Sequence, residues 1–110
     1  MWNIDGRTNL NDPKLHVRQL TSGLSQPTSM AFIGPSDILV LQKNDGLVRR
    51  VINGVLQSGA VLSIAVETAS ERGLLGVAVH PNFSNNHFVY LYFTHSGTTC
   101  GVLPASPPVN

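Results

Sequence analysis

Apolar residues along the chain fall into short runs, and each run is bounded by residues that favour turns. Four such runs lie between residues 27 and 57, at 28–33, 38–41, 47–52 and 55–57. Turn signals this closely spaced leave room for hairpins but not for the crossover of a parallel βαβ unit. The pattern therefore predicts four antiparallel strands in this part of the chain.

The turns on either side of the third run are the clearest. Asp45-Gly46 precedes it and Asn53-Gly54 follows it, and both pairs tolerate the positive φ that tight hairpin turns require. The run 38–41 is apolar at every position, which predicts a strand covered on both faces. Charged residues make up only 12% of the chain, against roughly 25% in ordinary globular chains. This shortfall agrees with strands that stack between two neighbours.

Further strands are predicted on both sides of these four. Residues 14–20 alternate polar and apolar with period two, which is typical of a half-exposed strand. The runs 74–79 and 88–94 predict the first two strands of a second sheet, joined by the turn-rich segment 80–86. Residues 61–66 are interpreted as an outer strand that leads into a crossing loop.

The predicted fold class is all-β, with one antiparallel four-stranded blade and part of a second. A four-stranded meander is one blade of a β-propeller or half of a sandwich, and inner strands covered on both faces favour the propeller. Three regions are expected: an irregular N-terminal arm at 1–13, a partial β-propeller at 14–95, and an irregular or truncated tail at 96–110. The tail is rich in proline, which cannot donate a backbone N–H to a sheet.

Composition argues against several functional classes. A net charge of +1 gives no basic footprint for nucleic acid. The single cysteine, Cys100, excludes a disulfide framework or a Cys-based zinc site within the chain. No apolar run reaches the ~18 residues of a membrane helix, and no signal peptide is visible. The histidines lack ligand spacing, so no metal site is expected in this chain. Arg49-Arg50 is interpreted as a solvated strand edge rather than a phosphate clamp.

Two charged residues stand at the mouth of a predicted strand. Glu71 and Arg72 directly precede Gly73, where the missing Cβ lets the backbone turn sharply. Charge beside a tight turn at a strand end is a common setting for a ligand site. The alternative is a local ion pair on a surface loop, worth about 0–1 kcal/mol. His80 is interpreted as a turn residue that bonds backbone rather than a general base, because no carboxylate nearby in sequence would orient it.

Three segments occur in an order that is typical of one enzyme family. They are 23–32, 38–49 and 71–83, and the last reads ERGLLGVAVHPNF. Together they resemble the start of the soluble glucose/sorbosone dehydrogenases, the pyrroloquinoline-quinone (PQQ) dependent aldose dehydrogenases. The resemblance covers about residues 14–95, and the last segment carries most of its specificity. It implies a six-bladed β-propeller of which this chain is the N-terminal part.

The resemblance also implies a chemistry. The family oxidises the anomeric carbon of an aldose by hydride transfer to PQQ, with a His general base and a Ca²⁺ ion that helps to hold the quinone. It places that His, the metal ligands and the quinone contacts on later blades, so this chain is expected to hold no catalytic residue and to be inactive alone. Glu71 and Arg72 are the residues assigned to sugar binding. Several members have Gln where this chain has Glu71, and a carboxylate can also accept hydrogen bonds from sugar hydroxyls.

The parent protein is therefore expected to be a sugar dehydrogenase in the periplasm or outside the cell. The alternatives are a non-enzymatic β-propeller that binds a carbohydrate or a protein, and a gene fragment with no function of its own. Two blades cannot close into a ring, so we expect bare sheet faces that favour self-association. These faces should be lined by Val40, Val48, Val77, Val89 and Leu91.

Overall fold

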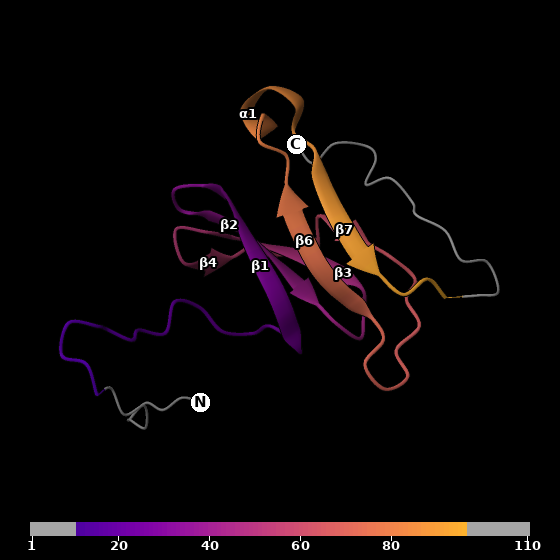
Figure 1. Ribbon diagram of the computed structural model, residues 1–110, viewed down its shortest axis with the longest axis horizontal. Coiled ribbons are helices and arrows are strands. Elements are labelled where there is room, and N and C mark those ends of the chain that lie inside the picture. Colours follow the sequence, from indigo (N-terminus) through magenta and orange to yellow (C-terminus); the bar gives the residue numbers. More distant parts are fainter. Residues whose placement is uncertain (1–10, 97–110) are drawn as a thin grey trace.

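The computed structural model describes residues 11–96, which form two antiparallel sheets and one short helix (Figure 1). The first sheet has the strand order β1 (Pro27–Gly34), β2 (Asp37–Gln42), β3 (Leu47–Ile52) and β4 (Val55–Leu56), with β5 (Leu62–Ser63) also paired to β3. The second sheet consists of β6 (Leu74–Val79) and β7 (Val89–Phe93), and α1 (Phe83–Asn86) lies between them in the chain. The predicted all-β, antiparallel architecture is confirmed.

The four strands predicted between residues 27 and 57 are all present. Each strand pairs with the next, and the register places Met30 opposite Val40, and Val40 in turn opposite Arg49. The Asn53-Gly54 turn adopts positive φ at both residues, 51° and 79°, as a tight hairpin turn requires. The outer strand expected at 61–66 is shorter than predicted and pairs only at β5 and at one bridge from Val66 to His95.

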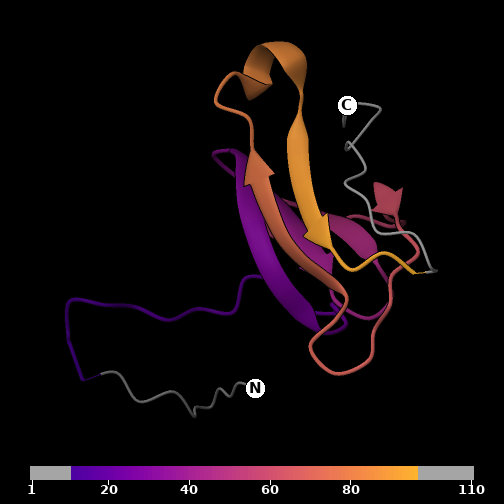
Figure 2. The same cartoon turned by 45° about the vertical axis from the view of Figure 1, so that its right-hand side comes forward.

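The predicted strand at 14–20 is absent, and this prediction is wrong. All seven residues are exposed, including Leu15 at 58% and Val17 at 55%. The arm that contains this segment extends away from both sheets (Figure 2), and only the end of the segment returns to the first sheet, where Leu20 lies against Gly54 of the β3–β4 turn. A strand needs a neighbour that pairs its backbone N–H and C=O groups. The alternation of polar and apolar residues at 14–20 was therefore not enough to form a strand.

The main core lies between the two sheets. The β6–β7 hairpin lies across one face of the first sheet (Figures 1 and 2). A bulge between Leu74 and Gly76 shifts the alternation along β6, so that Leu74, Val77 and Val79 all pack inward. The fully buried members of this cluster are Leu39, Leu41, Val48, Leu74 and Val89.

The opposite face of β2 packs in a second, smaller cluster. Ile38, Val40 and Val51 are buried there, with Leu24 and Leu56 packed against them. As predicted, β2 is therefore covered on both faces, and the residues from Ile38 to Gln42 are all buried. Among residues 11–96, no helix has the length and apolarity needed to cross a membrane.

The apolar residues that remain exposed differ from those predicted. Val40, Val48 and Val89 are buried, and Val77 and Leu91 pack partly buried against the main core. The β6–β7 hairpin covers the face that carries Val48, and Leu24 and Leu56 pack on the opposite face against the cluster that holds Val40. The predicted bare surface therefore does not exist. The large apolar side chains exposed on the strands are instead Met30 and Phe32 of β1, Val55 of β4, and Tyr90 and Tyr92 of β7.

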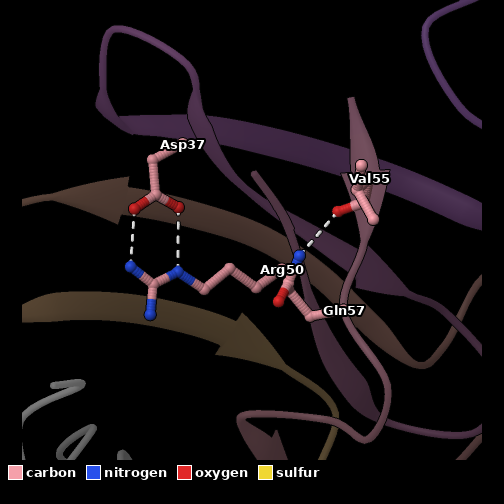
Figure 3. Close-up of polar contacts among 4 residues, drawn as sticks. All are labelled: Asp37, Arg50, Val55 and Gln57. Carbon is pink, nitrogen blue, oxygen red and sulfur yellow. Dashed lines mark hydrogen bonds and ion pairs between the residues drawn. The ribbon is translucent and has the colours of Figure 1, made fainter. Parts of the chain in front are cut away.

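Arg50 forms a two-pronged ion pair with Asp37 across the β2–β3 hairpin (Figure 3). Its Nε donates to Asp37 Oδ1 at 2.9 Å, and its Nη2 donates to Oδ2 at 2.6 Å. These hydrogen bonds lower the pKa of the Asp37 carboxyl below its usual value, although partial burial opposes the shift and the charge of Arg50 adds to it. The pair also raises the pKa of Arg50.

The interpretation of Arg49-Arg50 as a solvated strand edge is wrong. Both residues lie on β3, which pairs on both sides, and both are half-buried. Arg49 Nη1 donates to Gln42 Oε1 at 3.3 Å, and Nη2 donates to the Gln57 carbonyl at 3.2 Å. The two guanidinium groups therefore bond the chain to itself.

Candidate functional site

The candidate site is the loop of residues 67–73, directly before β6. We call it the substrate loop after the sugar-binding role that the sequence predicts for Glu71 and Arg72. The loop meets the turn that follows β2, because the amide of Leu74 donates to the Lys43 carbonyl at 3.0 Å. Lys43 is tied in turn to the start of β1, where its own amide donates to the Gln26 carbonyl at 3.0 Å. The Thr28 hydroxyl donates to the Leu74 carbonyl at 2.9 Å. The ends of three strands therefore hold the base of the loop.

Gly73 allows the loop to approach this turn. It is buried and has φ 145°, a conformation that residues with a Cβ rarely adopt. A Cβ at this position would lie 2.5 Å from the Lys43 carbonyl oxygen and 2.8 Å from Lys43 Cγ. The close contact explains why a glycine follows the charged pair.

A second contact fixes the middle of the loop. Lys43 Nζ donates to the Ser70 carbonyl oxygen at 3.0 Å. Ser70 itself has φ 58°, a left-handed conformation that is uncommon for a residue with a side chain. Nothing in the local sequence indicates this contact, because the two residues are 27 positions apart.

Glu71 and Arg72 lie on this loop, and both are exposed. Arg72 Nη1 lies 3.8 Å from Glu67 Oε2, with side-chain exposures of 59% and 44%. Such an exposed pair contributes little to stability. Within residues 11–96, the Glu71 carboxylate makes no hydrogen bond or ion pair. The local ion pair weighed from the sequence for Glu71 and Arg72 is therefore not formed, and Arg72 lies beside Glu67 instead.

A polar network around the buried side chain of Gln42 supports the turn beneath the loop, and little in the sequence indicated it. Gln42 is 2% exposed, and its Oε1 accepts from the Ser25 amide at 3.1 Å. Its Nε2 donates to Asp45 Oδ2 at 2.8 Å, which closes the turn. Arg49 Nη1 also bonds this glutamine. The one sign in the sequence was the position of Gln42, a polar residue that directly follows the apolar run 38–41.

His80 lies after the other end of β6, away from the substrate loop, and its predicted structural role is confirmed. The Asn82 amide donates to His80 Nδ1 at 2.9 Å. The side-chain nitrogen of Asn86 also lies 3.0 Å from Nδ1. The ring therefore organises the turn that leads into α1.

The described residues do not fit the cofactors that the resemblance implies. No group of three or more His, Cys, Asp or Glu side chains among residues 11–96 could hold a metal ion. The cations beside the substrate loop are Lys43 and Arg72, which contact Ser70 and Glu67. We therefore assign neither PQQ nor Ca²⁺ to any residue in this region. Cys100 and the tail at 97–110 lie outside the described residues.

Residues 24–103 match the family described as glucose/sorbosone dehydrogenase. The chain belongs to this family. An uncharacterised protein of Synechocystis is 35% identical over 94 residues, which cover 77% of this chain and 23% of that protein. The family match over residues 24–103 includes the whole of both sheets and the substrate loop.

Solved structures of glucose/sorbosone dehydrogenases share the architecture. The PQQ-bound aldose sugar dehydrogenase of Streptomyces coelicolor is 30% identical, with a TM-score of 0.66 over 73% of this chain and 24% of its own. A putative glucose dehydrogenase of Thermus thermophilus is also 30% identical, with a TM-score of 0.64 over 72% and 23%. The chain spans about a quarter of the length of these relatives. The predicted membership of a β-propeller dehydrogenase family is thus confirmed.

Proposed function

We propose that the whole protein is a sugar dehydrogenase that oxidises the anomeric carbon of an aldose and transfers a hydride to PQQ. Support comes from the family match over 24–103 and from a relative whose structure is described as PQQ-bound. Bound PQQ would supply the hydride acceptor. The groups that hold the quinone, any Ca²⁺ ion and the catalytic base are proposed to lie beyond residues 11–96.

The proposed part of this chain in the reaction is sugar binding by Glu71 and Arg72. The observation that carries this role is the position of Glu71, which is exposed on a loop anchored at both ends and has no bonding partner within residues 11–96. A carboxylate offers two oxygens that can accept hydrogen bonds from sugar hydroxyls. Binding through a fixed loop loses little conformational entropy, because the loop is already ordered.

Arg72 has a more limited role in the proposal. Its guanidinium lies beside Glu67 at 3.8 Å and stays 59% exposed, so its remaining N–H groups can donate to a sugar oxygen. Glu71 and Arg72 would then offer an acceptor and a donor side by side. Sugar hydroxyls both donate and accept hydrogen bonds, and this pairing suits them. We extend the proposal to an extracytoplasmic location, which rests on the family resemblance alone.

Dye reduction by the whole protein tests this function. We expect an aldose to reduce the dye only when PQQ and Ca²⁺ have been added, and polyols without an anomeric carbon to be inert. The 110-residue chain alone serves as the control and should give background rates. Sugar binding without any dye reduction would contradict the enzyme proposal and support a non-enzymatic carbohydrate-binding propeller. Turnover by the 110-residue chain would contradict the placement of the catalytic groups.

A further inference from the structure

We propose that Lys43 is a positioning residue that sets the orientation of Glu71 through the carbonyl group of Ser70. The contact is the 3.0 Å hydrogen bond from Lys43 Nζ to the Ser70 oxygen. Its consequence for sugar oxidation rests on the proposed function, whereas its consequence for the loop itself does not. The two can therefore be tested separately.

Lys43 is suited to this role because its own backbone is fixed. Its amide donates to the Gln26 carbonyl and its carbonyl accepts from the Leu74 amide, both at 3.0 Å. The turn that it begins is closed by the bond from buried Gln42 to Asp45. The aliphatic part of the lysine lies against Gly73, where a Cβ would be 2.8 Å from its Cγ. The ammonium group is thus carried by a stem with little freedom to move.

The Ser70 carbonyl controls the direction of the next residue. The peptide unit is planar, so the oxygen of Ser70 and the amide nitrogen of Glu71 belong to the same rigid group. A hydrogen bond to this oxygen therefore fixes the orientation of the peptide plane that joins Ser70 to Glu71. The direction of the Glu71 side chain depends on that plane.

The bond also stabilises an unfavourable backbone conformation. Ser70 has φ 58°, and a residue with a Cβ keeps such a conformation only where its surroundings impose it. The ammonium group makes the bond charge-assisted, and such bonds are stronger than those between neutral groups. Without it, Ser70 can relax toward negative φ and rotate the peptide plane that carries Glu71.

Kinetics of the whole protein give the first test. Lys43→Met keeps the aliphatic stem but removes the donor. We expect it to raise the KM for the aldose about three- to tenfold, which corresponds to the net contribution of one ordinary hydrogen bond, with kcat and PQQ affinity unchanged. Lys43→Arg, which can still donate, should restore the KM. Lys14→Met removes the other lysine of the chain, on the exposed arm, and should have no effect.

A double variant separates positioning from other effects of the lysine. If Lys43 acts through Glu71, then Lys43→Met should add no further rise in KM to a protein that already carries Glu71→Ala. An additive rise would overturn the proposal, because it would show that Lys43 contributes independently of Glu71.

Hydrogen–deuterium exchange gives a readout that does not depend on activity. The Arg72 amide donates to the Ala69 carbonyl at 3.1 Å within the substrate loop. In Lys43→Met we expect the hydrogen-bonded backbone amide of Arg72 to exchange about three- to tenfold faster, and Lys43→Arg should return it to the original rate. Unchanged exchange would overturn the positioning role even in an active enzyme. Faster exchange in a protein without sugar turnover would support the role and contradict only the proposed function.

Discussion

Gly73 lies so close to the backbone of Lys43 that a Cβ at position 73 would be 2.5 Å from the Lys43 carbonyl oxygen. The same carbonyl accepts the hydrogen bond from the Leu74 amide. This contact joins the end of β2 to the start of β6, and with it the first sheet to the substrate loop.

Gly73→Ala should therefore destabilise the protein strongly. We expect a loss of about 2–4 kcal/mol in the free energy of unfolding, because the new methyl group meets backbone atoms and the residue must keep a positive φ. Gly59→Ala is the matched control. Gly59 also has positive φ, at 74°, but a Cβ there meets nothing within 4 Å, so only about 1–2 kcal/mol should be lost. Equal losses in chemical denaturation would show that the contact with Lys43 is unimportant.

The Asp37–Arg50 pair should make stability sensitive to acid. Because Arg50 lowers the pKa of folded Asp37, the pair stabilises the folded state above the unfolded pKa of about 3.9. The stabilisation is lost as the pH falls through the lower folded pKa. Arg50→Met should cost about 1–2 kcal/mol at pH 7, and the difference from the original protein should shrink below about pH 4.

Denaturation curves from pH 2 to pH 7 measure this effect. Arg18→Met, on the exposed arm, is the control and should leave stability unchanged at every pH. A difference between Arg50→Met and the original protein that stays constant down to pH 2 would mean that the ionisation of Asp37 is not linked to folding.

The isolated 110-residue chain should self-associate through the exposed face of β1. Phe32 is 57% exposed and Met30 is 51% exposed, and both point from the same face of an edge strand. Apolar side chains in such a position favour association. Light scattering after size-exclusion chromatography should detect oligomers, and the double variant Phe32→Gln, Met30→Gln should reduce them. Val17→Gln is the control, since Val17 is 55% exposed but lies on the arm. A monodisperse monomer with a sharp thermal transition would contradict this prediction.

The strands were predicted correctly where the residues of the connecting turn are themselves enough to favour a hairpin. Asn53-Gly54 favours a hairpin by itself, and the continuous apolar run at 38–41, bounded by turn signals, favours a strand covered on both faces. Residues 14–20 had an equally regular pattern but no partner strand, so the same reasoning failed there. A strand is a property of two segments, whereas the pattern describes one.

The sequence predicted that Glu71 and Arg72 lie directly before a strand, but not the contacts that hold their loop. Glu71 and Arg72 lie on an exposed loop before β6, as expected from the charge beside Gly73. The contacts that hold the loop join residues far apart in sequence, such as Lys43 and Ser70. Long-range hydrogen bonds leave no periodic signal, and only the packing of the two sheets brings these residues together.

The kinetics of Glu71→Ala in the whole protein test most directly whether Glu71 binds the sugar, as we propose. Loss of a charged hydrogen-bond acceptor should lower kcat/KM for the preferred aldose about ten- to a hundredfold. PQQ affinity should not change. Glu71→Gln, whose amide oxygen can still accept, should retain most of the activity, and Asp12→Ala on the exposed arm should match the original protein. Unchanged kinetics in Glu71→Ala would show that Glu71 is only a surface carboxylate.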